Sequence, residues 1–211
     1  MDFRCTEWTS VKDLINKMKL FAIEKTGTDT VPKEIERKWL VKDKDKLLEH
    51  LQKTYKCISH KNVTSGYLSI DPEIRYAGIC NLVTDEMQYK LTYKSGEGLV
   101  RDELEVTVDF STSIQLAKAI RSIRGIKAYG DSIFIIKDFY VFDLNGKKLH
   151  VSIVDPPKGF VYMEIEFKSE EKANEYELPH DVMKFVKKDV TMDERYKMKQ
   201  YWARTRLPKQ Y

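Results

Sequence analysis

Charged and apolar residues alternate along several short segments of the chain. In residues 34–41, EIERKWLV, one set of alternate positions carries Glu34, Glu36 and Lys38, while the other set is mainly apolar. Successive side chains of a β-strand point to opposite faces, so this alternation predicts a strand with one charged face. The alternation recurs in residues 88–94, 100–108 and 161–167.

Other extended segments lie between these strands. They cover residues 65–70, 73–78, 133–142 and 147–154. Asn145-Gly146, a dipeptide typical of tight hairpins, is expected to join the last two of them. The tail, residues 189–198, is predicted to form a last short strand or an ordered loop.

Helical spacing of apolar residues predicts helices outside the strands. They are expected over residues 9–25, from Asp43 onward, over 111–124, and in two pieces at 169–178 and 179–188 that are interrupted at Pro179. Thr9 or Ser10 is expected to cap the first helix. Ser111 or Thr112 is expected to cap the third, and Gly125 to end it.

These elements favour one α+β domain built on an antiparallel barrel. If the sheet closes, the charged strand faces must line its interior, because the reverse arrangement would expose rows of apolar side chains to water. The alternative for a single segment such as 34–41 is a half-solvated strand whose charged face contacts water.

A closed barrel would enclose many glutamates, each costing several kcal/mol if left unpaired. These are Glu34, Glu36, Glu103, Glu105, Glu164 and Glu166. The interior cations that would offset part of this cost are Lys38, Arg75, Lys94, Arg101 and Lys137. A divalent cation and a bound polyphosphate would complete the neutralisation, since carboxylate oxygens suit such metals and lysine or arginine suits phosphate.

Composition narrows the class of protein. The 211 residues are 42% apolar and 33% charged, which is typical of a globular chain, and a net charge of +4 is too small to indicate a specific nucleic-acid partner. Cys5, Cys57 and Cys80 form no metal or redox motif, which favours free thiols in a reducing compartment. Without a long apolar run or a signal-peptide core, we expect a cytoplasmic protein with no membrane contact.

EIERK resembles the E-x-E-x-K signature of the CYTH superfamily, the triphosphate tunnel metalloenzymes. Later segments resemble successive motifs of that family in the same order: GYLS, IRYAG, LTYK, VRDELEV, IKDFY, MEIEF and DVTMDERY. The resemblance implies an eight-stranded antiparallel β-tunnel with a charged interior and helices packed outside. It covers residues 32–211 and leaves residues 1–31 as an N-terminal helical extension.

The resemblance also implies roles for individual residues. Catalysis would fall to Glu34, Glu36 and Lys38. Mg²⁺ or Mn²⁺ would be bound by Glu34, Glu36, Glu164 and Glu166, with Glu103 and Glu105 in support. Phosphate oxygens would be bound by Lys38, Arg75, Lys94, Arg101, Lys137 and Arg195. Arg195 has an alternative, which is a simple ion pair with Asp193 or Glu194.

The chain departs from the family pattern at several positions. Arginines are expected where Ala77 and Phe139 stand, and acidic residues where His150 and Ser152 stand; asparagines often occur where Met198 and Gln200 stand. These replacements reduce both the cationic and the acidic lining of the tunnel. Either the substrate preference has changed, or the tunnel mainly binds its ligand.

Three functions remain open from the sequence. The first is metal-dependent hydrolysis of a triphosphate, with inorganic triphosphate favoured and thiamine or nucleoside triphosphates as other substrates. The second is a class IV adenylyl cyclase that makes cyclic AMP from ATP. The third is a non-catalytic module that binds polyphosphate or a nucleotide. In each case the partner is a small triphosphate-containing molecule, and a homodimer is compatible with the sequence.

Overall fold

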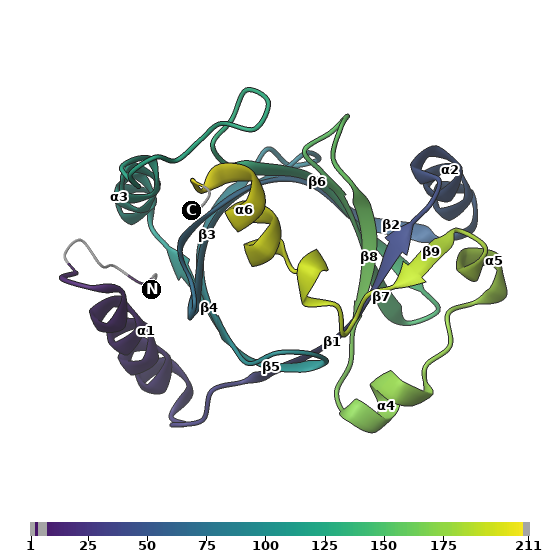
Figure 1. Ribbon diagram of the computed structural model, residues 1–211. Helices are drawn as coiled ribbons and strands as arrows, with labels where there is room; N and C mark the ends of the chain where they lie inside the picture. The colour runs from purple at the N-terminus through teal and green to yellow at the C-terminus, as the bar shows by residue number, and fades with distance from the viewer. Residues whose placement is uncertain (1–2, 4–7, 209–211) are drawn as a thin grey trace.

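The computed structural model describes residue 3 and residues 8–208. Within this part of the chain, eight antiparallel strands form a closed barrel (Figure 1). They are β1 (Lys33–Val41), β2 (Lys56–Ile70), β3 (Glu73–Asn81), β4 (Met87–Ser95), β5 (Val100–Val108), β6 (Ile135–Leu144), β7 (Lys147–Val154) and β8 (Val161–Glu166). The predicted α+β fold on an eight-stranded antiparallel barrel is therefore confirmed.

Strand β1 closes the barrel. The strand order is β5-β4-β3-β2-β6-β7-β8-β1, and the first residues of β1 pair back onto β5, with Glu34 opposite Arg101. The middle of β1 pairs with β8, where Glu36 lies opposite Glu166 and Lys38 opposite Glu164. A short additional strand, β9 (Val186–Asp189), pairs with the end of β1 outside the closed set. Strand β1 thus pairs with three other strands.

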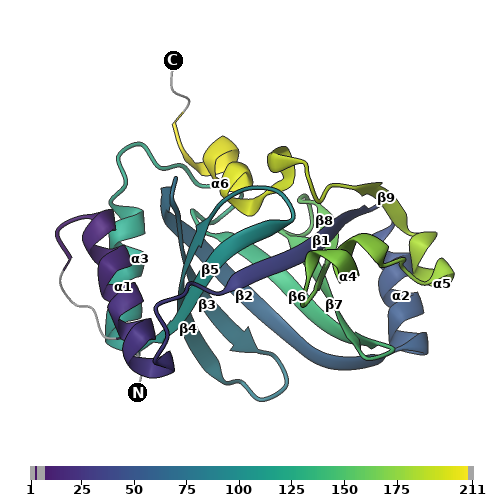
Figure 2. The ribbon, with the colours of Figure 1, turned by 90° about the horizontal axis from the view of Figure 1, so that it is seen from below.

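Six helices lie outside the barrel in the described chain. They are α1 (Val11–Thr26), α2 (Lys44–Thr54), α3 (Phe110–Arg121), α4 (Glu170–Glu175), α5 (His180–Met183) and α6 (Met198–Arg206). Helices α1 and α3 lie side by side on one flank, α2, α4 and α5 lie on the opposite flank, and α6 lies at one end of the barrel (Figures 1 and 2). None of the described helices is long and apolar enough to cross a membrane.

The helices bury the apolar outer faces of the strands. One apolar cluster includes Leu14 and Met18 of α1 together with strand residues. Trp202 of α6 belongs to the same cluster and packs on Tyr67 of β2 at one end of the barrel. A second cluster packs Leu47 and Leu51 of α2 against strand residues such as Trp39. Because apolar area is removed from water on the outside, the charged faces are left to line the inside.

Local sequence signals predicted several helix starts and the Asn145-Gly146 hairpin correctly. Ser10 and Asp43 accept hydrogen bonds from the backbone at the starts of α1 and α2, as caps do. Asn145 and Gly146 both have positive φ, 54° and 86°, which is the geometry expected of a tight hairpin. The cap of α3 was predicted wrongly: it is Asp109, whose side chain accepts a hydrogen bond from the Thr112 amide.

The second half of the chain differs from the prediction in three places. Helix α3 ends at Arg121 and does not continue to Gly125. The piece expected to be helical over 179–188 stops at Met183, because the chain then extends to pair with β1 as β9. The tail after β9 is an ordered loop with one 3-10 turn at Glu194–Tyr196, and it leads into α6, which the alternation did not reveal. Cys57 and Cys80 are free thiols, and Cys5 lies outside the described residues.

A buried ion pair fastens α6 to the barrel. The Arg206 side chain is fully buried, and its Nη2 donates to Asp155 Oδ2 at 2.7 Å and to the Phe134 carbonyl at 3.0 Å. Tyr201 donates to the same Asp155 oxygen at 2.9 Å. Removal of one partner of such a pair leaves the other charge buried without compensation.

Arg206→Leu should therefore lower the free energy of unfolding by about 3 kcal/mol, because Asp155 loses its guanidinium partner in a buried setting. Urea denaturation monitored by circular dichroism measures this change. Arg204→Leu, an exposed arginine on the same helix, is the matched control and should change stability by less than about 0.5 kcal/mol. Equal effects of the two substitutions would show that the ion pair does not hold α6.

Candidate active site in the barrel interior

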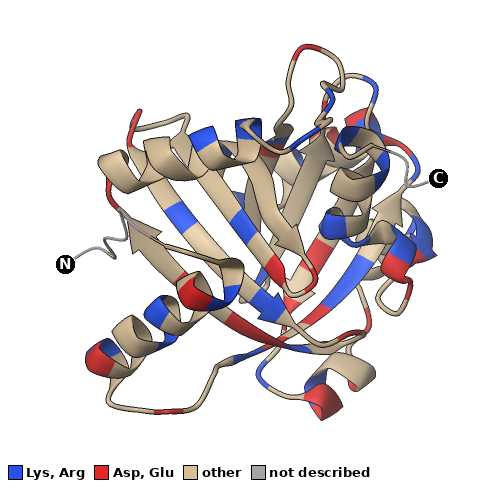
Figure 3. Cartoon of the chain, turned by 60° about the vertical axis from the view of Figure 1, so that its left-hand side comes forward, with Lys and Arg blue, Asp and Glu red and all other residues tan. Residues whose placement is uncertain are grey.

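The barrel encloses a cavity of about 560 Å³, a size typical of small-molecule sites. Acidic and basic positions both occur along the barrel strands (Figure 3), and many of them line this cavity. The predicted site residues that line it are Glu34, Glu36, Lys38, Arg75, Lys94, Arg101, Glu103, Glu105, Lys137, Glu164 and Glu166. The structure thus brings eleven of the twelve predicted residues to one cavity.

Arg195 is the exception. Its side chain is 76% exposed, and its Nε and Nη2 donate to the two oxygens of Asp193 at 2.8 and 2.7 Å. The structure therefore places Arg195 outside the cavity, in the alternative ion pair with Asp193. Lys197, two residues later, lines the cavity instead: its Nζ lies 3.8 Å from Glu36 Oε1 and donates to the Gly98 carbonyl at 3.3 Å.

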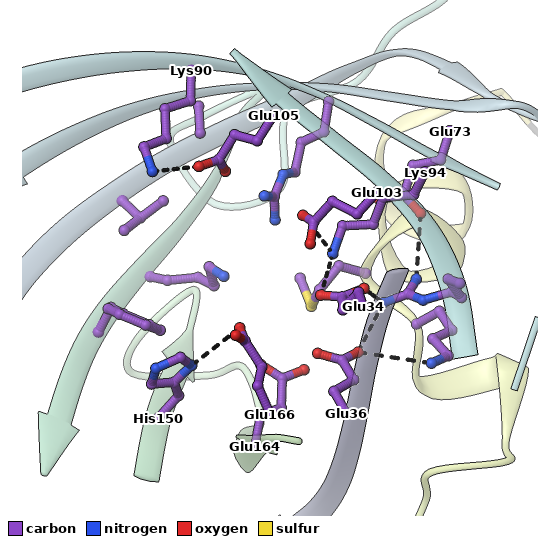
Figure 4. A pocket seen from close by; sticks show the side chains of 18 of the residues that line it. Glu34, Glu36, Glu73, Lys90, Lys94, Glu103, Glu105, His150, Glu164 and Glu166 are labelled. Atoms are coloured by element: carbon purple, nitrogen blue, oxygen red, sulfur yellow. Dashed lines mark hydrogen bonds and ion pairs between the residues drawn. The ribbon is translucent and has the colours of Figure 1, made fainter. Parts of the chain in front are cut away.

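Glu34 and Glu36 share one guanidinium. Arg101 Nη2 donates to Glu34 Oε2 and to Glu36 Oε1, each at 2.8 Å, and Lys94 Nζ donates to Glu34 Oε1 at 2.6 Å (Figure 4). Burial and the charge of Glu36 raise the pKa of Glu34 to about 7. Burial opposes ionisation of Glu36 too, but Lys94 and Arg101 outweigh it and lower the pKa of Glu36. One of the two carboxylates is therefore set to gain or lose a proton near neutral pH.

Strand β8 supplies the opposite side of this charged region. Lys38 Nζ donates to Glu164 Oε1 at 2.9 Å and lies 3.5 Å from the centre of the Tyr162 ring. Glu166, the cross-strand partner of Glu36, is exposed and points toward the same space in Figure 4. The carboxylates of Glu36 on β1 and Glu166 on β8 thus face the same part of the cavity, with Lys38 on the same face of β1.

Arg75 and Lys137 differ from the other predicted cations, because neither makes an ion pair with a carboxylate in the described chain. Arg75 Nη2 donates to Thr92 Oγ1 at 3.3 Å, and its buried Nε has no hydrogen-bond partner among the described residues. Lys137 is 7% exposed, and among the described residues its Nζ donates to the Tyr162 hydroxyl alone, at 3.3 Å. Burial and the neighbouring Arg75 charge lower the pKa of Lys137 from its ordinary value to about 7.

The carboxylates fit a divalent cation by chemistry but are not assembled as a complete cage. Among the described residues, no three His, Cys, Asp or Glu side chains stand together closely enough to hold a metal ion. The reason is that several are engaged: Glu34 with Lys94, Glu164 with Lys38, and Glu105 with Lys90. Mg²⁺ commonly takes only one or two carboxylates and completes its coordination with water and substrate phosphates. Glu36 and Glu166 could serve in that way.

Several lining residues were missed by sequence reasoning. Glu73 is 5% exposed and lies 3.8 Å from Arg101 through its Oε2. Its alternation with Arg75 along β3 was the signal that could have identified it. Lys90 shares a face with Lys94 and could have been found in the same way. Lys197 had no such signal, because it lies in the tail, outside any alternating segment.

No family model matches this chain, and no curated protein matches it in sequence. Its fold is similar to that of PH1819 from Pyrococcus horikoshii, with a TM-score of 0.53 at 15% identity over 81% of this chain and 96% of that one. Weaker likenesses include a candidate adenylyl cyclase of Hippeastrum, HpAC1, described as revealing a dominant triphosphatase activity (TM-score 0.43, 14% identity, 67% of this chain and 82% of that one). A candidate adenylate cyclase of Bacillus halodurans has a TM-score of 0.43 at 16% identity, over 85% of this chain and 95% of that one. The first of these likenesses confirms the fold.

Lys137→Met should stabilise the protein by about 4 kcal/mol at pH 7, because an unfolded lysine with a pKa near 10.4 must give up much of its protonation to be buried. The folded pKa is depressed to about 7, so the cost of burial is full below pH 7 and disappears as the pH rises toward 10. Urea unfolding at pH 7 and pH 9.5 measures both values. A gain that is equal at the two pH values, or a loss at pH 7, would contradict this account.

Proposed function

We propose that the protein hydrolyses a triphosphate inside the barrel with the aid of Mg²⁺ or Mn²⁺. The observation that carries this proposal is that Arg75 and Lys137 are cations without ion-pair partners in the described chain. Both line the barrel cavity, and neither makes an ion pair with a carboxylate of a described residue. A polyanion between them would satisfy the orphaned Arg75 Nε and favour the charged form of Lys137.

The cations can divide the phosphate chain among them. Arg75, with its forked guanidinium, suits two oxygens of one phosphate group, while Lys137 and Lys38 supply compact positive charges beside it. Lys94 and Arg101 lie further along β4 and β5, next to Glu34. Phosphoryl transfer depends mainly on such positioning and on neutralising charge on the equatorial oxygens.

Glu36 and Glu166 are the residues we assign to the metal, with Glu164, Glu103 and Glu105 in support. The metal would supply further positive charge to the transferring phosphoryl group. Glu34 is the best-placed general base for the attacking water, because its raised pKa lies close to neutral pH. Lys38, held against Glu164, would keep the reacting phosphate in line.

A second candidate function is binding of a triphosphate without turnover. The observation that favours it is that Glu34 is held in ion pairs with Lys94 and Arg101. Glu36 is held in ion pairs with Arg101 and Lys197, so neither carboxylate is free to receive a metal without rearrangement. The two functions share the cavity and differ only in whether the metal can displace these contacts.

Inorganic triphosphate with Mn²⁺ or Mg²⁺ should release orthophosphate, and Glu36→Gln should reduce that rate by at least about 100-fold, because it removes a negatively charged metal ligand. Phosphate release measured at several metal concentrations tests this. Glu49→Gln, the same change on the exposed face of α2, is the matched control and should retain full activity.

Full activity in Glu36→Gln would contradict the proposed hydrolysis. Triphosphate binding by calorimetry, with no phosphate release under either metal, would support the binding function instead. Formation of cyclic AMP from ATP would show that the protein is a cyclase, in which the 3′-hydroxyl of ATP replaces water as the attacking nucleophile.

A further inference from the structure

A second pocket of about 540 Å³ adjoins the barrel cavity. Both spaces are lined by His150 and Glu166, so they meet at these two side chains. The hairpin between β6 and β7 forms one side of the second pocket, and the segment that leads from β8 into α4 forms the other. Four lysines line this pocket among the described residues, and we call them the basic mouth: Lys147, Lys148, Lys168 and Lys172.

The basic mouth lies at the end of the barrel away from the attachment of α6. It includes the first two residues of β7, Lys147 and Lys148. At the other end of this strand Asp155, just past its last residue, accepts the hydrogen bond from Arg206 of α6. A strand of eight residues is about 25 Å long, and this length separates the mouth from the helix contact.

Inward side chains become more exposed toward the basic mouth. On β8 the side chain of Glu164 is 15% exposed, and that of Glu166, two residues nearer the mouth, is 60% exposed. Lys168 follows after two more residues and is exposed as well. The cavity therefore opens to water at this end of the barrel.

The positive charges of the basic mouth are unpaired. None of its four lysines makes an ion pair with a carboxylate in the described chain, and the carboxylate that lines the pocket with them, Glu166, lies 3.9 Å from His150 instead. Lys147 Nζ lies 4.9 Å from the centre of the Phe167 ring, a contact that supplies no counter-ion. Several unpaired charges of one sign around an opening attract ions of the opposite sign.

The position of the mouth suits a first contact with a polyanion. Lys137, inside the cavity, is buried, and burial lowers its pKa to about 7, so it is only partly protonated near neutral pH before a ligand arrives. The lysines of the mouth are exposed or half-buried, so they contact dissolved anions without being taken out of water. Clefts lined by charge of one sign raise association rates by about 10- to 1,000-fold.

We propose that the basic mouth is an outer anion-binding site, and that the ligand of the barrel enters through it. The ligand class is a phosphate polyanion, because lysines contact phosphate oxygens as compact point charges. The ligand then moves past His150 to Lys137 and Arg75. The path into the barrel rests on the proposed triphosphate site, whereas anion binding at the mouth does not.

Removal of three exposed charges from the mouth tests this route. Lys148→Gln/Lys168→Gln/Lys172→Gln should lower kcat/KM for inorganic triphosphate about tenfold at an ionic strength of ~20 mM, because encounter with the anion slows. At ~500 mM the loss should shrink to less than about twofold, since screening removes the attraction. The value of kcat should not change, because these side chains lie outside the barrel cavity. Phosphate release at a series of ionic strengths measures these effects.

The matched control is Lys12→Gln/Lys25→Gln/Lys118→Gln, which removes the same net charge from exposed lysines of α1 and α3 on the other flank (Figure 1). It should change kcat/KM by less than about twofold at either ionic strength. Changing the same three mouth lysines to arginine keeps the charge and should retain the wild-type values. Equal losses in the two glutamine variants, or a loss that persists at high ionic strength, would overturn the proposed route.

Binding at the mouth can be followed without hydrolysis. Backbone amide NMR signals of residues 146–148 and 167–172 should shift when inorganic triphosphate is added without metal, and the glutamine variant of the mouth should lack these shifts. Shifts at the mouth alone, without turnover, would reject the proposed triphosphate site and support the outer anion site. Shifts confined to the barrel strands would reject the outer site and leave the proposed function intact.

Discussion

Charge enclosed within a closed sheet is the constraint on which the rest of this structure depends. A barrel wall removes its inward side chains from bulk water on every side, so each interior carboxylate needs a cation or a bound ligand. The protein meets this need unevenly. Glu34 and Glu36 are satisfied by Lys94 and Arg101, whereas Arg75 and Lys137 face the cavity without a carboxylate partner in the described chain. This uneven pairing is the basis for our proposal that the interior binds an anion.

The helices packed outside the barrel allow its interior to be charged. Helices on both flanks bury the apolar outer faces of the strands, with Leu14 on one side and Leu47 on the other. Strand β1 links the two requirements, because it pairs with β5, β8 and β9 and also carries Glu34, Glu36 and Lys38 into the cavity. The buried pair of Arg206 and Asp155 then fixes α6 at one end of the barrel. Strand β1 therefore both closes the barrel and supplies part of the charge in its cavity.

The sequence revealed the elements whose signals are local and strictly periodic. Alternation of period two identified the charged faces of β1, β4, β5 and β8, and the short turns between strands favoured an antiparallel barrel. The closed, eight-stranded form was an expectation from the family resemblance. Tertiary pairing determined what alternation could not: residues 186–189 extend because β1 offers an open edge, and Arg195 turns outward because Asp193 lies two residues away. Lys197 enters the cavity only because the tail passes over the barrel, which no local pattern reports.

The most direct test of the account is a crystal structure with a non-hydrolysable triphosphate analogue and Mn²⁺, whose anomalous signal locates the metal. The account predicts phosphate density inside the barrel between Arg75, Lys137 and Lys38, with Mn²⁺ between that density and Glu36. An analogue bound outside the barrel, or an empty interior in which Arg75 and Lys137 have found carboxylate partners, would contradict it.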